Sequence, residues 1–141
     1  MKEISAGGVV YKREGDKIKI LLIEDRYHKI TIPKGKQEPG ETLAETALRE
    51  IKEETGIEGR IVQPLDVVHY QYNGADRGWI DKEVTYYLVE SIGGKLTVQE
   101  EEINEAFWAE LEEAHQLQQE KGYVNNEAIM EQAYRYLKQL S

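Results

Sequence analysis

Three glutamates at helical spacing are the residues of this sequence best placed to do chemistry. Glu53 and Glu54 follow Glu50 by three and four residues, so on a helix Glu50 faces both of the others. Each like-charged pair destabilises a helix by roughly 0.2–0.5 kcal/mol unless something positive neutralises it. A hard cation such as Mg2+, which prefers carboxylate and phosphate oxygens, would do so. The spacing therefore indicates either a metal site or the solvated face of a Glu-rich helix.

The residues around these glutamates predict the helix that must carry them. Thr42 and Glu45 have the spacing of a capping box, and neither Gly nor Pro interrupts the run to Thr55. Gly56 is suited to a left-handed cap at the end. An apolar stripe that would face the core is formed by Ala44, Ala47, Leu48 and Ile51.

The segment before this helix favours the metal site. Pro33-Lys34-Gly35-Lys36 and Glu38-Pro39-Gly40-Glu41 are rich in turn residues and bring two lysines, with backbone amides and oxygens, close to the glutamates. Such an arrangement can hold a cation and a polyphosphate together.

The same residues match a known sequence signature. Over 23 residues, all nine fixed positions of the Nudix box are filled by Gly35, Glu41, Arg49-Glu50-Ile51, Glu53-Glu54 and Gly56-Ile57. The chain therefore resembles the MutT-like Nudix hydrolases. The resemblance implies an α/β fold, in which a mixed β-sheet is sandwiched between α-helices (α/β/α). It also implies that the box forms a loop, helix and loop carrying the metal site.

The resemblance further implies how the box residues act. Water attacks a phosphorus of a nucleoside diphosphate linked to another group, and the carboxylates bind Mg2+ or Mn2+. Here Glu53 and Glu54 would be the primary metal ligands, and Glu50 a further ligand or the general base. Gly35 would lie near the metal.

Two supporting features complete this expected site. Arg49 lies one turn from both Glu45 and Glu53, so we interpret it, with Glu41, as structural support for the cluster. Many family members add a glutamate from outside the box. The acidic run 100–105 would supply it here, with Glu102 the first choice and Glu101 the next, although a solvated acidic loop explains the run equally well.

Segments outside the box resemble the branch that hydrolyses diadenosine polyphosphates. These segments are 32–36, 82–88 and 102–114. In that branch a strand tyrosine stacks on adenine and a lysine contacts phosphate, which here would be Tyr86 or Tyr87, and Lys82. Strand alternation lets only one of the two tyrosines face the cleft. Ile30 stands where the branch often has an aromatic residue, and replacement stacking would come from Tyr70, Tyr72 or Trp79. Lys34 and Lys36 are further candidates for phosphate binding.

Other activities of the same fold stay open. A pyrophosphohydrolase of ordinary or oxidised nucleoside triphosphates fits the box as well. The net charge of −9 disfavours an RNA 5′-end or diphosphoinositol substrate, and an isomerase would need the cysteine that the sequence lacks. A Nudix-fold sensor without turnover typically loses box carboxylates, which are all present here.

Composition sets the broader limits. The 141 residues fit one domain spanning 1–141. The acidic balance argues against a nucleic-acid polymer, which needs clustered Lys and Arg, but not against a small nucleotide. No cysteine is present, and no apolar run reaches the length of a signal-peptide core or a membrane span. We expect a cytoplasmic protein without a membrane partner, as a monomer or a homodimer.

Apolar patterning predicts the remaining elements. The expected strands are Ile4–Tyr11 and Ile18–Glu24 around a turn at 14–16, then Ile30–Ile32, Ile61–Tyr72, Glu83–Ser91 and Ala106–Ala109. Two further helices are expected over Leu111–Glu120 and Asn126–Leu140, the second capped by Asn126.

Overall fold

The computed structural model describes residues 1–98 and 103–141. Along the chain the elements are β1 (Lys2–Glu14), β2 (Lys17–Asp25), β3 (Ile30–Thr31), β4 (Lys34–Lys36), α1 (Leu43–Thr55), β5 (Ile57–Asn73), the 3-10 turn η1 (Ala75–Arg77), β6 (Trp79–Gly94), β7 (Ile103–Glu110), α2 (Leu111–Lys121), the 3-10 turn η2 (Val124–Asn126) and α3 (Glu127–Leu140). Every strand and helix expected from the sequence is present, and most strands are longer than expected.

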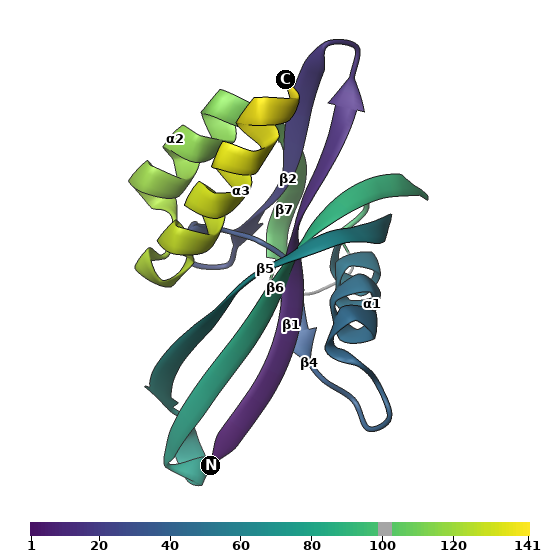
Figure 1. The fold of residues 1–141 in the computed structure, drawn as a ribbon. Helices are drawn as coiled ribbons and strands as arrows, with labels where there is room; N and C mark the ends of the chain where they lie inside the picture. The colour runs from purple at the N-terminus through teal and green to yellow at the C-terminus, as the bar shows by residue number, and fades with distance from the viewer. Residues whose placement is uncertain (99–102) are drawn as a thin grey trace.

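The strands form one mixed sheet between helices. In the described part of the chain the order is β3-β2-β1-β6-β5, with β4 paired to β1 and β7 paired to β2. β1 runs parallel to β6, whereas the β1–β2 and β5–β6 pairs are antiparallel. Figure 1 shows α1 on one side of the sheet and α2 with α3 on the other. The predicted α/β/α architecture is confirmed.

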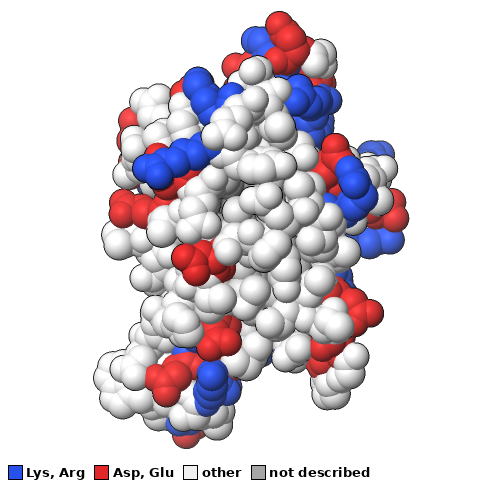
Figure 2. Space-filling model, viewed as in Figure 1, with Lys and Arg blue, Asp and Glu red and all other residues white. Residues whose placement is uncertain are grey.

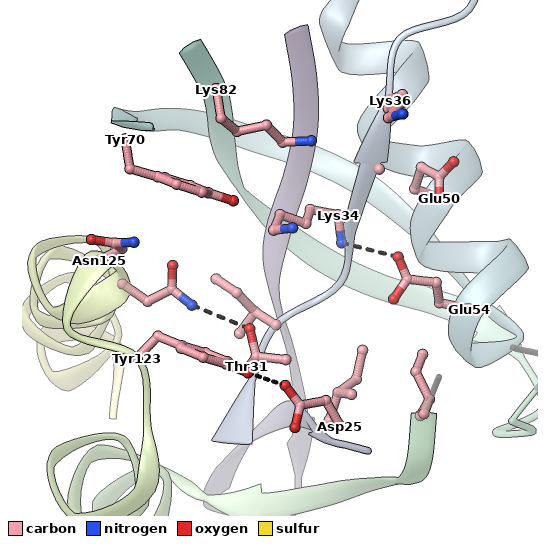
Figure 3. Close-up of a pocket in the computed structure, with 15 residues that line it drawn as sticks. Asp25, Thr31, Lys34, Lys36, Glu50, Glu54, Tyr70, Lys82, Tyr123 and Asn125 are labelled. Carbon is pink, nitrogen blue, oxygen red and sulfur yellow. Dashed lines mark hydrogen bonds between the residues drawn. The ribbon is translucent and has the colours of Figure 1, made fainter. Parts of the chain in front are cut away.

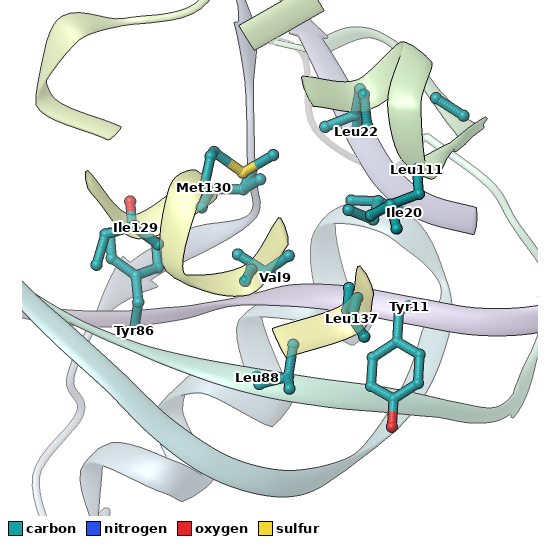
Figure 4. Packing of buried hydrophobic residues seen from close by; sticks show 14 of the residues in the cluster. Val9, Tyr11, Ile20, Leu22, Tyr86, Leu88, Leu111, Ile129, Met130 and Leu137 are labelled. Carbon is teal, nitrogen blue, oxygen red and sulfur yellow. The ribbon is translucent and has the colours of Figure 1, made fainter. Parts of the chain in front are cut away.

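The core is divided by the sheet into two apolar clusters. The larger one lies under α2 and α3, where Val9, Leu88, Ile129 and Leu137 pack together (Figure 4). The smaller one lies under α1 and includes Ile51. Because β1 contributes to both clusters, its middle is a nearly continuous buried run rather than an alternating one.

Leu137 is expected to contribute strongly to stability. Its side chain is fully buried on α3, so Leu137→Ala removes apolar contacts and leaves a cavity. We expect the free energy of unfolding to fall by about 2–5 kcal/mol, measured by urea denaturation followed by circular dichroism. Leu140→Ala, at a half-exposed position of the same helix, is the control and should change stability by about 0.5 kcal/mol or less. Equal effects of the two changes would contradict the packing described.

Local hydrogen bonds define α1 as the sequence predicts. Thr42 Oγ1 accepts from the Glu45 backbone N–H, and the Glu45 carboxylate accepts from the Thr42 N–H, which completes the capping box. Gly56 ends the helix in the left-handed region at φ 80°. The helix that carries the three glutamates is therefore fixed at both ends.

The start of α3 differs from the prediction. Asn126 precedes the helix, but its side chain makes no capping hydrogen bond. Its amide instead donates to Thr31 Oγ1 at 3.2 Å, and the residue is buried. A hydrogen bond to β3 thus takes the place of the local capping hydrogen bond. It ties the segment before α3 to the sheet.

The sequence patterns did not predict β4. Lys34-Gly35-Lys36 lacks the β-branched and aromatic residues typical of strands, yet it pairs antiparallel with residues 5–7 of β1. This pairing holds the segment before α1 against β1.

No helix in the described residues is long and apolar enough to span a membrane.

Candidate active site

A cavity of about 720 Å³ lies between β4 and α1 on one side and the segment before α3 on the other (Figure 3). Its volume is in the range of small-molecule sites, about 300–1,000 Å³. The residues that line it are spread along the chain and are Ile23, Asp25, Thr31, Ile32, Lys34, Gly35, Lys36, Glu50, Glu54, Tyr70, Lys82, Ile103, Tyr123, Asn125 and Asn126.

Two of the three helix glutamates line this cavity. The Glu54 carboxylate accepts a hydrogen bond from the Lys34 backbone N–H at 3.2 Å. The Glu50 carboxylate lies against Gly35 so closely that a Cβ at position 35 would stand 2.1 Å from its carboxyl carbon. Glycine at this position therefore permits the approach of the β4 backbone to the glutamate.

Arg49 is the centre of an ion-pair network at the cavity's acidic end. Its guanidinium donates to Glu41 at 2.6 Å, to Glu50 at 2.7 Å and to Glu53 at 3.1 Å. It also donates to the Lys36 carbonyl at 2.9 Å. The supporting role of Arg49 and Glu41 stays a prediction, for which these contacts provide the geometry.

The network shifts the pKa values of Glu41 and Arg49. The hydrogen bond from Arg49 is the main reason that the pKa of Glu41 falls to about 2, and the pKa of Arg49 is raised in return.

The expected contact from Arg49 to Glu45 is absent, because the Glu45 carboxylate caps the helix instead. Arg49 therefore supplies part of the positive charge that neutralises the closely spaced glutamates.

Glu53, unlike Glu50 and Glu54, does not line the cavity. Its side chain is about half exposed and lines a neighbouring recess with Lys52 and Gly56. Within the described residues, no three His, Cys, Asp or Glu side chains converge as metal ligands. Arg49 Nη1 donates to both Glu50 and Glu53, whereas Glu54 accepts from the Lys34 N–H, so different groups hold the three carboxylates.

The donor chemistry at this end of the cavity nevertheless fits a hard divalent cation. Glu50 and Glu54 supply carboxylate oxygens, and the absent Cβ of Gly35 leaves the β4 backbone within reach of Glu50. Glu102 and Glu101, the extra glutamates expected from the sequence, lie outside the described residues. Ile103, at the start of β7, lines the cavity.

The structure corrects the choice of stacking tyrosine. Tyr86 is only 1% exposed and packs in the larger core cluster, where burial raises the pKa of its hydroxyl. Tyr87 points to the opposite face and packs against the cluster under α1. Alternation does separate the two rings, but neither of them lines the cavity, because both faces of β6 are covered at this point.

Two other tyrosines occupy the cavity wall. Tyr70 of β5 was a predicted replacement, whereas Tyr123 was not predicted from the sequence, since it follows α2 in a segment without a regular pattern. The Tyr123 hydroxyl donates to the Asp25 carboxylate. Burial and this hydrogen bond raise the pKa of Tyr123. Tyr72 and Trp79 do not line the cavity.

All three lysines predicted for phosphate binding line the cavity. Lys34 and Lys36 come from β4, and Lys82 comes from β6. Figure 3 shows Lys34 and Lys82 between Glu50 and Glu54 on one side and Tyr70 and Tyr123 on the other, with Lys36 beside Glu50. The cavity therefore has an acidic end, a basic middle and an aromatic end.

This α/β/α sandwich, in which a loop and a helix present carboxylates to a lysine-lined cavity, is the arrangement expected of the Nudix class of proteins. The family model of the NUDIX domain matches residues 1–132. The chain therefore belongs to the Nudix family of pyrophosphohydrolases, enzymes that act on phosphoanhydrides and typically use a divalent metal.

Individual relatives refine this placement. The chain is 33% identical over 132 residues to the asymmetrical bis(5′-nucleosyl)-tetraphosphatase of Mus musculus, covering 92% of this chain and 87% of the relative. It is 34% identical over 118 residues to the putative mutator protein MutT4 of Mycobacterium tuberculosis (strain CDC 1551 / Oshkosh), covering 79% of this chain and 47% of that protein. The chain thus spans about half the length of the mycobacterial relative.

Among solved structures, a binary complex of a C. elegans Ap4A hydrolase superposes with a TM-score of 0.77 at 27% identity. The superposition covers 97% of this chain and 98% of that structure. The similarity therefore extends over nearly the whole described fold.

Proposed function

We propose that the protein is a Mg2+-dependent hydrolase, with Mn2+ as a possible substitute, that cleaves diadenosine polyphosphates of four to six phosphates. The observation that carries this proposal is the cavity itself, where lysines separate a carboxylate end from an aromatic end (Figure 3). In a bound substrate, a base would lie between the tyrosines and the phosphate chain along the lysines. The scissile phosphate would lie near the carboxylates. The names of the mouse and C. elegans relatives support the same substrate class.

Each region has a proposed role. The cation would be held by Glu50, Glu53, Glu54, Glu102 and the backbone at Gly35. When bound, it would neutralise phosphate charge and make its bound water more acidic. One of Glu50, Glu53 and Glu102 would accept the proton of the attacking water. Arg49 and Glu41 keep the carboxylates in place.

The remaining groups bind the substrate. Lys34, Lys36 and Lys82 would contact phosphate oxygens, and Tyr70 and Tyr123 would flank a base. On the face shown in Figure 2, Lys and Arg side chains are interspersed with Asp and Glu. This distribution agrees with a small nucleotide substrate rather than a nucleic-acid polymer, which requires clustered positive charge.

Tyr70→Leu tests the aromatic end. Leucine keeps an apolar side chain but removes the ring, and stacking contributes about 1–3 kcal/mol per base. We therefore expect the KM for diadenosine tetraphosphate to rise about tenfold or more, measured by steady-state kinetics. Tyr87→Leu removes a ring outside the cavity and is the matched control, for which KM should not change. Equal KM values for Tyr70→Leu and the unmodified enzyme would exclude this ring as the stacking group.

A second candidate function has a specific observation in its favour. The similarity to a protein named as a putative mutator protein supports a pyrophosphohydrolase of nucleoside triphosphates, including oxidised ones. Such a substrate would use the same carboxylates and lysines but would place only one base in the cavity.

Product analysis separates the candidates. The enzyme would be incubated with Mg2+ and diadenosine tetra-, penta- and hexaphosphate, ordinary and oxidised nucleoside triphosphates, ADP-ribose and a diphosphoinositol phosphate, and the products separated by anion exchange. Fastest turnover of a diadenosine compound, with ATP or ADP among the products, is the expected result. Preference for a triphosphate with release of pyrophosphate would replace the dinucleotide proposal. Absence of turnover across the panel would favour a Nudix-fold sensor.

A further inference from the structure

Glu3 of β1 is a buried carboxylate beside the cavity that the proposed reaction does not use. Only 8% of it is exposed, and it is the direct partner of Lys82 in the register between β1 and β6. Lys82 Nζ donates to it at 2.6 Å and the Tyr72 hydroxyl at 3.0 Å. Lys36 Nζ lies 3.1 Å and the Arg77 guanidinium 3.4 Å from its other oxygen. Residues from four different elements therefore converge on one side chain.

The charges of this group are unbalanced in a way that suits an anion. Glu3 carries one negative charge, and Lys36, Lys82 and Arg77 carry three positive charges, in a protein whose formal net charge is −9. Burial by itself would raise the pKa of Glu3, but the hydrogen bonds from Lys82, Lys36 and Tyr72 lower it to about 2. The carboxylate is therefore ionised at neutral pH, and its oxygens are occupied by cationic and hydroxyl donors rather than open to a metal.

Lys82 is a buried cavity residue whose ammonium group is paired with this carboxylate. Its side chain is only 8% exposed yet lines the cavity, and Figure 3 shows it extending from β6 toward the side where Lys34 and Lys36 lie. Burial lowers the pKa of Lys82, and the neighbouring Lys34 and Lys36 lower it further, whereas Glu3 raises it. A lysine has high rotamer entropy, so a partner that fixes its ammonium in advance reduces the cost of binding a ligand.

We propose that Glu3 is a positioning residue that holds Lys82 and Lys36 in place for the phosphate chain of a bound polyphosphate. The inference deepens the proposed function, on which it rests for the identity of the substrate, but its anion-binding part is independent of turnover. Glu3 acts through the two lysines and does not itself contact the ligand.

Binding of inorganic tripolyphosphate in the presence of EDTA, measured by isothermal titration calorimetry, tests the inference without metal or catalysis. Glu3→Gln should weaken binding about tenfold, which corresponds to about 1.4 kcal/mol. A carboxylate that merely neutralised the lysines would give the opposite result, because its loss would free positive charge and strengthen binding. Unchanged or tighter binding by Glu3→Gln therefore overturns the proposal.

A double-mutant cycle shows whether the effect passes through Lys82. Lys82→Met should also weaken tripolyphosphate binding about tenfold. Adding Glu3→Gln to Lys82→Met should weaken it by only about a further twofold, because Lys36 alone then remains to be positioned. Independent, fully multiplicative effects of the two changes would overturn the positioning role.

Two further variants guard against a purely structural effect. Glu3→Asp keeps the charge and shortens the reach, so positioning predicts weaker binding even if Glu3→Gln fails to fold, and unchanged binding by Glu3→Asp overturns the proposal. Glu14→Gln is the matched control at the far end of the same strand, where Glu14 also lies between two lysines, each at 2.9 Å. It should leave tripolyphosphate binding unchanged. Thermal unfolding of each variant verifies the fold.

Kinetics with the preferred substrate gives a separate readout. For Glu3→Gln the KM should rise about tenfold while kcat stays within about threefold, because binding rather than the chemical step is affected. If the unmodified enzyme turns over no nucleotide, the proposed function fails, but the tripolyphosphate cycle still decides the role of Glu3. A fall in kcat at constant KM would contradict the inference.

Discussion

Glu54→Gln is expected to lower kcat by about 10²–10⁴-fold while leaving the fold intact, because the cation that this carboxylate would hold stabilises the transition state by several kcal/mol and each ~1.4 kcal/mol corresponds to a factor of ten. Glutamine has the same shape, and its side-chain oxygen can still accept the hydrogen bond from the Lys34 N–H. What it lacks is the negative charge that a divalent cation requires at the end of the cavity where Glu50 and Glu54 lie. The measurement is steady-state turnover at saturating Mg2+, with circular dichroism to verify the fold.

Two comparisons make this result specific. Glu58→Gln removes a solvent-exposed glutamate that pairs only loosely with Lys52, at 3.5 Å, and should keep full activity. Glu53→Gln should lose activity as Glu54→Gln does if the cation draws Glu53 away from Arg49. Full activity in Glu53→Gln would mean that the metal site does not include Glu53, and full activity in Glu54→Gln would refute the assignment of the acidic end.

Gly35→Ala is expected to reduce kcat/KM by about 10²-fold, because displacement of a reacting group by about 1 Å is enough to cause a loss of this size. The new Cβ would stand 2.1 Å from the carboxyl carbon of Glu50 and 2.2 Å from one of its oxygens. The contact is with the flexible end of a side chain, so the glutamate can move at little cost to stability. Such a movement, however, would displace the Glu50 carboxylate from the place beside the cavity where Arg49 holds it.

The matched control is Gly93→Ala in β6, where the nearest atom to a new Cβ is 3.4 Å away. Both variants should unfold at nearly the same temperature as the unmodified protein, and only Gly35→Ala should lose activity. Parallel measurements of kcat/KM and thermal unfolding distinguish these effects. Unaltered turnover by Gly35→Ala would show that the fit between β4 and Glu50 has no role in catalysis.

The tyrosines that line the cavity could not be identified from the sequence alone. The alternation rule correctly separated Tyr86 from Tyr87 but did not show that both faces of β6 are covered there, by the two core clusters. Tyr70 was one of three aromatic residues proposed to replace the ring that is missing at Ile30, and the sequence did not distinguish it from Tyr72 and Trp79. Tyr123 gave no signal, since its place in the cavity depends on a contact with Asp25, 98 residues away.

The sequence by itself determined the features that depend on neighbouring residues. The capping box, the left-handed Gly56, the helical spacing of the glutamates and the order of the strands and helices other than β4 all follow from local hydrogen bonds and apolar periodicity. The Nudix box could be identified for the same reason, because its fixed positions lie within one loop and one helix.

Only the tertiary structure decided which side chains meet. Glu3 and Lys82 are 79 residues apart and become partners through the parallel pairing of β1 with β6. Arg49 could have paired with Glu45, but the fold brings Glu41 and the Lys36 carbonyl to it instead. Pairings between distant segments depend on strand register and packing, which no local pattern in the chain specifies.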